Sequence, residues 1–154
     1  VLFGLNFFVY IDRYYVHFPQ AQADYWGHGF KEATTLLMSE EYAYKTIVID
    51  KPEKSPYIFL LFYGKVDPAL YQKSVVRYPK TSEGFVHVKQ FRSFVFRPIL
   101  WDTERPDNAT TLVGLQPDIV TRFVDKKEYK MQIISQTPAY PLVTILSIGQ
   151  ERKE

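Results

Sequence analysis

Apolar positions in the N-terminal third of the chain recur with the spacing of helices. The opening run VLFGLNFFVYI is almost wholly apolar, and Leu2–Tyr15 is predicted to form a helix that ends before a turn at Phe18-Pro19. Four further apolar residues follow at steps of four, three and four: Trp26, Phe30, Ala33 and Leu37. Because this spacing places side chains on one face, a second helix is predicted to turn that face toward a core.

The segment Ser55–Gln72 carries two signals that start helices. The pairs Ser55-Pro56 and Asp67-Pro68 flank the apolar run Tyr57–Tyr63. A Ser or Asp before a helix accepts a hydrogen bond from an unpaired backbone N–H, and a Pro at the first helical position loses no useful donor. Since the run holds one β-branched residue, Ile58, its composition does not require a strand. Two short, largely buried helices are predicted, with a central strand as the alternative.

Strands are predicted on both sides of these helices. Lys45–Asp50 reads as a short β-branched strand that ends on an acid, and a strand followed by helices and another strand implies a parallel pair with a right-handed connection. The later strands are predicted at Phe85–Val88, Phe91–Phe96, Thr111–Gly114, Glu128–Ser135 and Leu142–Ile148. The residues Gln136–Pro141, with two prolines, are predicted to be a hairpin loop.

These elements together predict one domain over residues 1–154. Its predicted fold is α/β: a Rossmann-like three-layer sandwich with a mixed, partly parallel sheet flanked by helices and a C-terminal β-hairpin. Trp101–Asn108 is expected to be irregular, and Pro117-Asp118 is expected to form a turn. The tail Gly149–Glu154 is charged.

Composition narrows the functional classes. The net charge of +2 comes without a basic stripe, so a nucleic-acid partner is not expected. The absence of cysteine excludes disulfides, thiolate catalysis and cysteine-based metal sites. Aromatic residues make up 17% of the chain, which indicates either aromatic core packing or surfaces that stack on a planar or sugar-like ligand.

Motifs for catalysis or cofactor binding do not occur in the chain. His17, His28 and His87 are far apart and form no HExxH motif, and no nucleophile elbow or phosphate-binding glycine loop is present. The carboxylate pairs Glu40-Glu41 and Asp102/Glu104 lie in polar turns, where carboxylates are usually solvated. No catalytic residue, metal ligand or cofactor is therefore predicted.

Four residues are the candidates for ligand binding. Asp50 ends a parallel strand, and ligand clefts of open α/β sheets form at that edge. Asp67 begins a helix that could lie nearby, although a plain helix cap is the preferred explanation of this residue. Tyr63 and Tyr71 are aromatic side chains with polar tips that could stack on a sugar.

The apolar N-terminus allows two explanations. Its roughly 11 apolar residues are fewer than the roughly 20 that cross a bilayer, and no basic region of a signal peptide precedes them. It could be a buried N-terminal helix of the domain, or the trailing end of a transmembrane helix.

Several aromatic motifs resemble one known family. They are Tyr-Tyr-x-x-Phe-Pro at Tyr14–Pro19, Tyr25-Trp26-x-x-Gly29-Phe30-Lys31-Glu32-Ala33, Pro56-Tyr57-Ile58-Phe59-x-Leu61-Phe62-Tyr63, and Asp67-Pro68-x-x-Tyr71-Gln72. The set is similar to the region after the last transmembrane helix of bacterial family 39-type glycosyltransferases. These are polytopic enzymes similar to the dolichyl-phosphate-mannose protein mannosyltransferases and to the aminoarabinose transferases that modify lipid A. The resemblance covers residues 1–100 and, loosely, the C-terminal hairpin.

The resemblance implies a membrane context. Such enzymes transfer a sugar from a polyprenyl-phosphate donor to an acceptor on the outer face of the membrane, and their catalytic acids lie in loops that this chain does not contain. The chain would be the non-catalytic, C-terminal extracytoplasmic domain. Residues 1–16 would form the end of the last spanning helix or a helix at the interface. The aromatic residues Phe7, Phe8, Tyr10, Tyr14 and Tyr15 suit headgroup depth.

The expected partners follow from this context. They are the membrane part of the same polypeptide, an acceptor or glycan that the domain helps to bind, and the lipid-linked sugar donor of the parent enzyme. The alternative is a structural or interaction module that docks on the membrane part or on a partner protein without binding sugar. A free-standing α/β enzyme with an unrecognised site is a third hypothesis.

Overall fold

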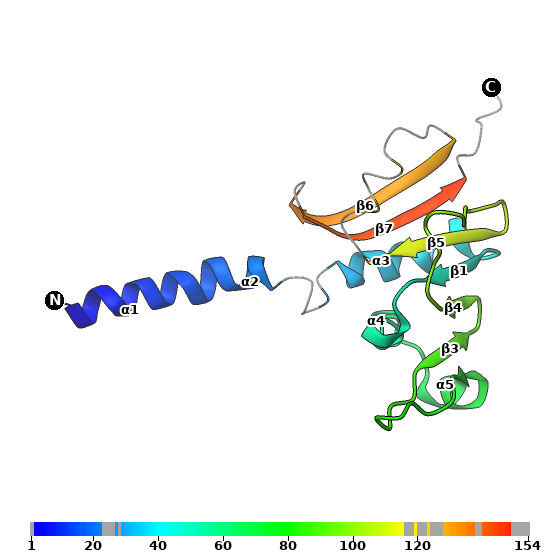
Figure 1. The fold of residues 1–154 in the computed structure, drawn as a ribbon, viewed down its shortest axis with the longest axis horizontal. Coiled ribbons are helices and arrows are strands. Elements are labelled where there is room, and N and C mark those ends of the chain that lie inside the picture. Colours follow the sequence, from blue (N-terminus) through cyan, green and yellow to red (C-terminus); the bar gives the residue numbers. More distant parts are fainter. Residues whose placement is uncertain are drawn as a thin grey trace.

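A computed structural model of the chain describes residues 2–22, 27, 29–115, 119, 123, 128–137 and 140–148. It is a mixed α/β domain with a seven-stranded sheet in the order β2-β3-β4-β1-β5-β7-β6 (Figure 1). The strands are β1 Thr46–Ile49, β2 Val76–Arg77, β3 Val88–Phe91, β4 Phe94–Phe96, β5 Thr110–Gly114, β6 Tyr129–Thr137 and β7 Tyr140–Ile148. The helical segments are α1 Leu2–Asp12, η1 Arg13–His17, α2 Phe18–Ala21, α3 Phe30–Leu37, η2 Glu40–Tyr42, η3 Pro52–Lys54, α4 Tyr57–Tyr63 and α5 Pro68–Ser74.

The centre of the sheet is a parallel trio of strands. Strand β1 lies between β4 and β5 and runs parallel to both, with Ile47 paired to Phe94 on one side and to Thr111 on the other. The outer pairs, β3 with β4, β2 with β3, β5 with β7 and β6 with β7, are antiparallel. The predicted parallel pair and the predicted C-terminal antiparallel strands are therefore confirmed.

Both faces of the central strands are buried in apolar clusters. Ile47 and Ile49 of β1 belong to a first cluster that also contains Ala33 and Leu37 of α3 and Leu60 of α4. Val48 points to the opposite face, because side chains alternate along a strand. There it joins a second cluster, made of Val48, Ile99, Trp101, Leu112, Ile119, Phe123 and Leu146. Burial on both faces explains why the β1 sequence is continuously apolar and not alternating.

Helix α3 turns the predicted face toward the sheet. Ala33, Thr34 and Leu37 are buried, and the ring of Phe30 stacks on that of Phe59 with centroids 4.5 Å apart. The helix begins after Gly29, whose φ of 85° lies in the left-handed region that favours glycine. Trp26, placed on the same face by the sequence, lies outside the described residues, as do Asp24 and His28.

The two helices predicted after β1 are present as α4 and α5, so the alternative of a central strand is wrong. The prediction that they are largely buried is also wrong, because Leu60 is the one buried residue of α4 and α5 has none. The Asp67 carboxylate accepts a hydrogen bond from the Ala69 backbone N–H at 2.9 Å, which is the predicted cap of α5. The predicted cap at Ser55 is absent, since Pro56 and not Ser55 stands at the N-cap position of α4, without a side-chain capping bond. Ser55 has a φ of 53°, and its backbone carbonyl accepts from the Ile58 N–H at 3.1 Å instead.

The N-terminal helix continues past the predicted turn at Phe18-Pro19. Segments α1, η1 and α2 follow one another from Leu2 to Ala21, and η1 is a π-helical turn in which the Phe18 N–H bonds to the Arg13 carbonyl. Because a π turn widens the hydrogen-bonded loop, Pro19 can stand at the start of α2 without interrupting the helix.

The same helix projects away from the sheet in Figure 1. No residue of α1 or η1 is buried, so the explanation of a helix buried against the domain is wrong. None of the helices in the described ranges is long and apolar enough to cross a membrane.

Several predicted strands have different bounds in the structure. The predicted strand Phe91–Phe96 contains a turn at Arg92, which has a φ of 52°, so that β3 and β4 form a tight antiparallel pair. The strand predicted at Phe85–Val88 lies instead at Val88–Phe91, as β3. There it pairs with β2, a short strand that the sequence did not predict.

The predicted loop Gln136–Pro141 is too long, because β6 continues to Thr137 and β7 begins at Tyr140, with Thr137 paired to Tyr140. The predicted Pro117-Asp118 turn, residues 138–139 and the charged tail lie outside the described residues.

Candidate functional site

The carboxyl ends of the three parallel strands meet at one edge of the sheet. Asp50 follows β1, Arg97 follows β4, and Leu115 follows β5. Ligand clefts of open α/β sheets form at such an edge, so the side chains there are the first candidates for a site.

Asp50 is buried at this edge and holds three hydrogen bonds. Its Oδ1 atom accepts from the backbone N–H of Lys51 at 2.9 Å and from that of Ile99 at 3.1 Å. Its Oδ2 atom accepts from the indole Nε1–H of Trp101 at 3.0 Å. Only 4% of Asp50 is exposed. The carboxylate therefore anchors the segment after β4 to the end of β1, because buried donors on that segment need an acceptor.

A bidentate ion pair folds the same segment. Arg97 donates through both terminal nitrogens to the two carboxylate oxygens of Glu104, at 2.9 and 2.6 Å. The hydrogen bond to Glu104 raises the pKa of Arg97, and the hydrogen bond from Arg97 lowers the pKa of Glu104. Glu104 Oε1 also accepts from the Leu100 backbone N–H at 3.0 Å. Each charge is thus neutralised by its partner, which suits a structural brace better than acid–base chemistry.

Two further side chains close the segment. Arg105 donates to the Trp101 carbonyl at 2.9 Å, and its guanidinium lies 5.2 Å from the centroid of the Phe123 ring. The Tyr78 hydroxyl donates to the Phe96 carbonyl at 2.9 Å. The region that reads as polar and irregular in the sequence is therefore held by specific contacts.

The other candidate binding residues lie on α4 and α5. Asp67 is an exposed helix cap, and Tyr63 is 36% exposed with its ring edge-on to that of Phe62 at 5.1 Å. Tyr71 is half-buried, with its ring stacked on that of Tyr57 at 6.3 Å and edge-on to that of Phe91 at 5.5 Å. Burial raises the pKa of Tyr71.

The contacts of these residues divide between the two faces of the sheet. Asp50 bonds to Ile99 and Trp101, which belong to the second apolar cluster, whereas Tyr71 packs against the first. Within the described part of the chain, no hydrogen bond or ring contact joins Asp50 to Tyr63, Asp67 or Tyr71. A shared ligand site for the four residues remains a prediction.

One carboxylate of each pair singled out in the sequence forms an ion pair in the structure. Glu41 forms an ion pair with Lys130 at 2.6 Å, as Glu104 does with Arg97. Among the residues that the structure describes, no three His, Cys, Asp or Glu side chains gather where they could hold a metal ion.

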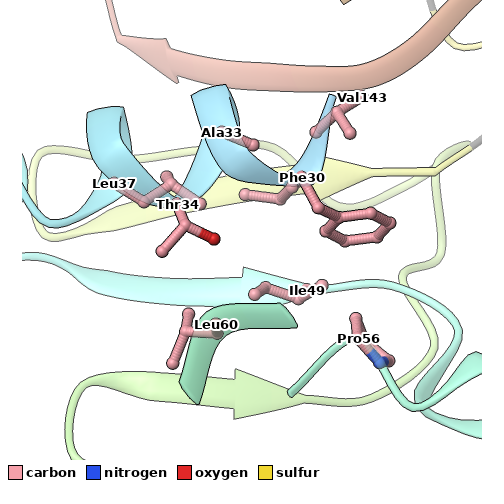
Figure 2. Close-up of a pocket in the computed structure, with 9 residues that line it drawn as sticks. Phe30, Ala33, Thr34, Leu37, Ile49, Pro56, Leu60 and Val143 are labelled. Carbon is pink, nitrogen blue, oxygen red and sulfur yellow. The ribbon is translucent and has the colours of Figure 1, made fainter. Parts of the chain in front are cut away.

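A small apolar cavity lies between α3, α4 and the sheet (Figure 2). Its volume is about 10 Å³, close to the smallest space that one water needs. Its lining consists of Phe30, Ala33, Thr34, Leu37, Ile49, Pro56, Leu60, Val113 and Val143, and Thr34 is the one polar side chain among them. Since a stable water needs two or more polar partners, this cavity is a packing gap and not a ligand site.

Sequence reasoning did not find Arg97 and Trp101, which complete the Asp50 site. Arg97 comes directly after a strand that ends at the same edge, and Trp101 is a large aromatic residue within a polar stretch. The position of Arg97 after a parallel strand could have placed it beside Asp50, but neither residue reveals its hydrogen-bond partner locally.

Comparisons of the chain with protein-family models, with curated proteins and with solved structures found no match.

Proposed function

We propose that this chain is a non-catalytic domain at the extracytoplasmic face of a membrane. It would be the C-terminal part of a polytopic family 39-type glycosyltransferase that transfers a sugar from a polyprenyl-phosphate donor. The observation that carries this proposal is the uncovered apolar helix α1, in which Leu2 is 77%, Phe3 85% and Phe8 72% exposed. A helix that is apolar on all sides is stable in apolar surroundings, such as lipid or other membrane helices.

The aromatic residues that follow α1 support a membrane boundary. The ring of Tyr14 stacks on Tyr10 at 5.8 Å and on Phe18 at 6.0 Å, and all three side chains are about half exposed. Aromatic side chains with polar tips favour the level of the lipid headgroups. Helix α1 would then lie in the membrane, with η1 and α2 leading out of it toward the domain.

The finer fold that we propose is a Rossmann-like three-layer sandwich. Apolar clusters on both faces of the parallel strands support it. Helices α3 and α4 contribute to the first cluster. On the second face, Ile119 and Phe123 are buried with helical backbones, four residues apart, which is the spacing of one face of a helix.

Two roles of such a domain can be compared. A role in acceptor or glycan binding would use an open polar cleft at the strand ends, but Asp50 is occupied there by three donors from the protein itself. A docking role would use exposed apolar surface, and Ile58 and Phe62 of α4 are 52% and 75% exposed. The geometry therefore favours docking against the membrane or the membrane part of the same polypeptide, with glycan binding as the alternative.

The proposal is tested by binding of the full chain to lipid vesicles. We expect the chain to sediment with vesicles and the variant Phe3→Ser/Phe8→Ser to remain in solution, because the variant removes two apolar side chains of α1. The matched control is Tyr44→Ser, since Tyr44 is 98% exposed in a turn remote from α1 in the sequence.

Enzymatic and glycan assays complete the test. We expect no hydrolysis of sugar nucleotides or polyprenyl-phosphate sugars by the purified chain. Turnover of either substrate, or equal vesicle binding by the α1 variant and the wild type, would show that the proposal is wrong. Chemical-shift changes on glycan titration, centred on Tyr63, Asp67 and Tyr71, would favour the glycan-binding role over docking.

A further inference from the structure

A second apolar surface lies on α4, apart from the N-terminal helix. Ile58 and Phe62 are four residues apart, so they stand on the same face of α4, and both are exposed. The opposite side of the helix carries Leu60, which is 3% exposed and belongs to the first core cluster. We call Ile58, Phe62 and the neighbouring Tyr63 the α4 ridge.

The α4 ridge lies outside the core of the domain. Its residues lie outside the buried part of the first cluster, while Leu60 and the half-buried Tyr57 and Leu61 provide the contacts with the sheet. The ring centroids of Phe62 and Tyr63 are 5.1 Å apart, and Phe62 is 75% exposed. Isolated exposed apolar residues are common, but two large ones on one helical turn form a surface suited to burial elsewhere.

The excess of positive charge is concentrated in the segment that follows the α4 ridge in the sequence. Residues 65–92, which directly follow α4, carry six Lys and Arg and two Asp and Glu, whereas the rest of the chain carries thirteen and fifteen. Lys73 lies on α5, and Arg77 and Lys89 lie on β2 and β3 at one edge of the sheet, whereas Lys65, Lys80 and Arg92 lie in the connections between elements. All six cations are exposed.

The positions of α4, β3 and α5 would allow all three elements to face one flat surface. In Figure 1, α4 lies on the side of the sheet from which the N-terminal helix extends, with β3 and α5 beside it. An apolar ridge next to a basic edge is the combination by which peripheral proteins bind anionic bilayers, since the apolar side chains enter the interface and the cations meet the headgroups.

We infer that the α4 ridge and the basic edge of residues 65–92 form a second contact with the membrane, on an anionic lipid surface. This inference rests on the proposed membrane anchoring by α1 and adds to it: the domain lies against the bilayer and does not extend away from it. The charge excess selects an anionic lipid surface over an uncharged apolar partner.

The absence of cysteine allows a direct test with single labels. An environment-sensitive dye is attached to the full chain at Phe62→Cys, at Tyr44→Cys as the matched exposed control, or at Phe8→Cys as a separate reporter of α1. With vesicles that contain phosphatidylglycerol, we expect the emission of the dye at positions 62 and 8 to shift to the blue and to be quenched by lipid-bound quenchers. The dye at position 44 should stay unchanged.

Vesicle-binding measurements show how much the α4 ridge contributes to the affinity for the membrane. The variant Ile58→Ser/Phe62→Ser should bind these vesicles about tenfold more weakly than the wild type, because it removes apolar area from the interface. Tyr44→Ser should bind as the wild type does. Binding should also weaken with added salt, because the headgroup contact is electrostatic. Since Ile58 and Phe62 are exposed, far-UV circular dichroism should show that the variant remains folded.

The outcomes separate this inference from the proposed function. If the dye at position 8 enters the lipid while the dye at position 62 stays in water, the contact by α4 is wrong and anchoring by α1 stands. If position 62 responds only when the membrane part of the polypeptide is present, the partner of α4 is protein and the inference is wrong. Equal binding to phosphatidylcholine alone would overturn the role of the basic edge. If neither position responds, both proposals are wrong.

Discussion

At the scale of single residues, Asp50 shows how a position that suits a ligand can serve the fold. The carboxylate lies at the expected edge of the sheet, yet its oxygens accept from Lys51, Ile99 and Trp101. The main-chain donor of Ile99 and the indole of Trp101 are buried, and each would lose its partner without the carboxylate. Asp50 therefore contributes to stability through the loop that it holds.

The substitution Asp50→Asn tests this role. We expect it to lower the free energy of unfolding by about 2 kcal/mol, because an amide nitrogen replaces one acceptor and meets a donor. Urea denaturation followed by far-UV circular dichroism measures the change. The control is Asp67→Asn, which should change stability by less than about 0.5 kcal/mol, since Asn caps a helix nearly as well as Asp. Equal losses in both variants would contradict the role given to Asp50.

The Arg97–Glu104 pair predicts a dependence of stability on pH. The pKa of Glu104 in the folded protein lies below its ordinary value of 4.5. The pair therefore stabilises the fold fully above that pH, and its contribution is lost as the pH falls through the lower folded pKa. The gap in unfolding free energy between the wild type and Glu104→Gln should be about 1 kcal/mol or less at pH 7, since the side chains are 39% and 25% exposed.

Urea denaturation of both proteins between pH 7 and pH 3 measures this gap. It should narrow below pH 4.5 as Glu104 becomes protonated. A gap that stays constant across this range would show that the carboxylate charge of Glu104 does not stabilise the fold.

At the scale of elements, local signals predicted the structure where they agreed with the tertiary contacts. Three signals come from residues close together in the chain: the β-branched run of β1, the helical spacing of α3 and the Asp67-Pro68 start of α5. All three elements are present in the structure. The turn at Arg92 was missed because an arginine at positive φ gives no local signal. The helix through Pro19 was missed because the π turn before it accommodates the proline.

The candidate site was predictable only in part, for a related reason. The end of a parallel strand locates Asp50 from the sequence, but Ile99 and Trp101 reach it from about fifty residues away. These partners reach Asp50 only because the segment after β4 passes over the end of β1, and no local sequence pattern predicts that path.

The contact between η2 and β6 gives a prediction about elements. The Tyr42 hydroxyl donates to Gln132 Oε1 at 2.8 Å, and Glu41 pairs with Lys130 two residues earlier on the same strand. Tyr42 is 1% exposed. Tyr42→Phe should lower the free energy of unfolding by about 1 kcal/mol, because the Gln132 carbonyl loses its donor.

Amide hydrogen exchange should locate the effect of Tyr42→Phe in β6. Glu41→Gln is the comparison, and its effect should be smaller because both side chains of that ion pair are nearly half exposed. An equal or larger loss of unfolding free energy in Glu41→Gln would show that the ion pair stabilises the fold at least as much as the Tyr42 hydrogen bond does.

At the scale of the whole molecule, the chain consists of a two-sided core and a helix that takes no part in it. Two apolar clusters cover the faces of the central strands, while α1 has no buried residue. The proposed anchoring by α1 would therefore use a part of the chain that does not contribute to the core.

This division predicts that α1 can be changed without loss of the domain. The variant Phe3→Ser/Phe8→Ser should have the same free energy of unfolding as the wild type within about 0.5 kcal/mol, because the substituted side chains make no contact with the core. Urea denaturation in detergent, which keeps both proteins monomeric, measures it. A loss of several kcal/mol would show that α1 packs on the domain in solution.

The central position of β1 has a consequence for synthesis of the protein on the ribosome. Its two neighbours, β4 and β5, are translated well after it, so both edges of Thr46–Ile49 have unpaired backbone groups until the chain reaches Phe96, and one edge until it reaches Gly114. The nascent chain thus carries an apolar strand with no partner on either side. Helices α3 and α4, which are complete by Tyr63, are the elements available to shield one face of this strand from other chains in the meantime.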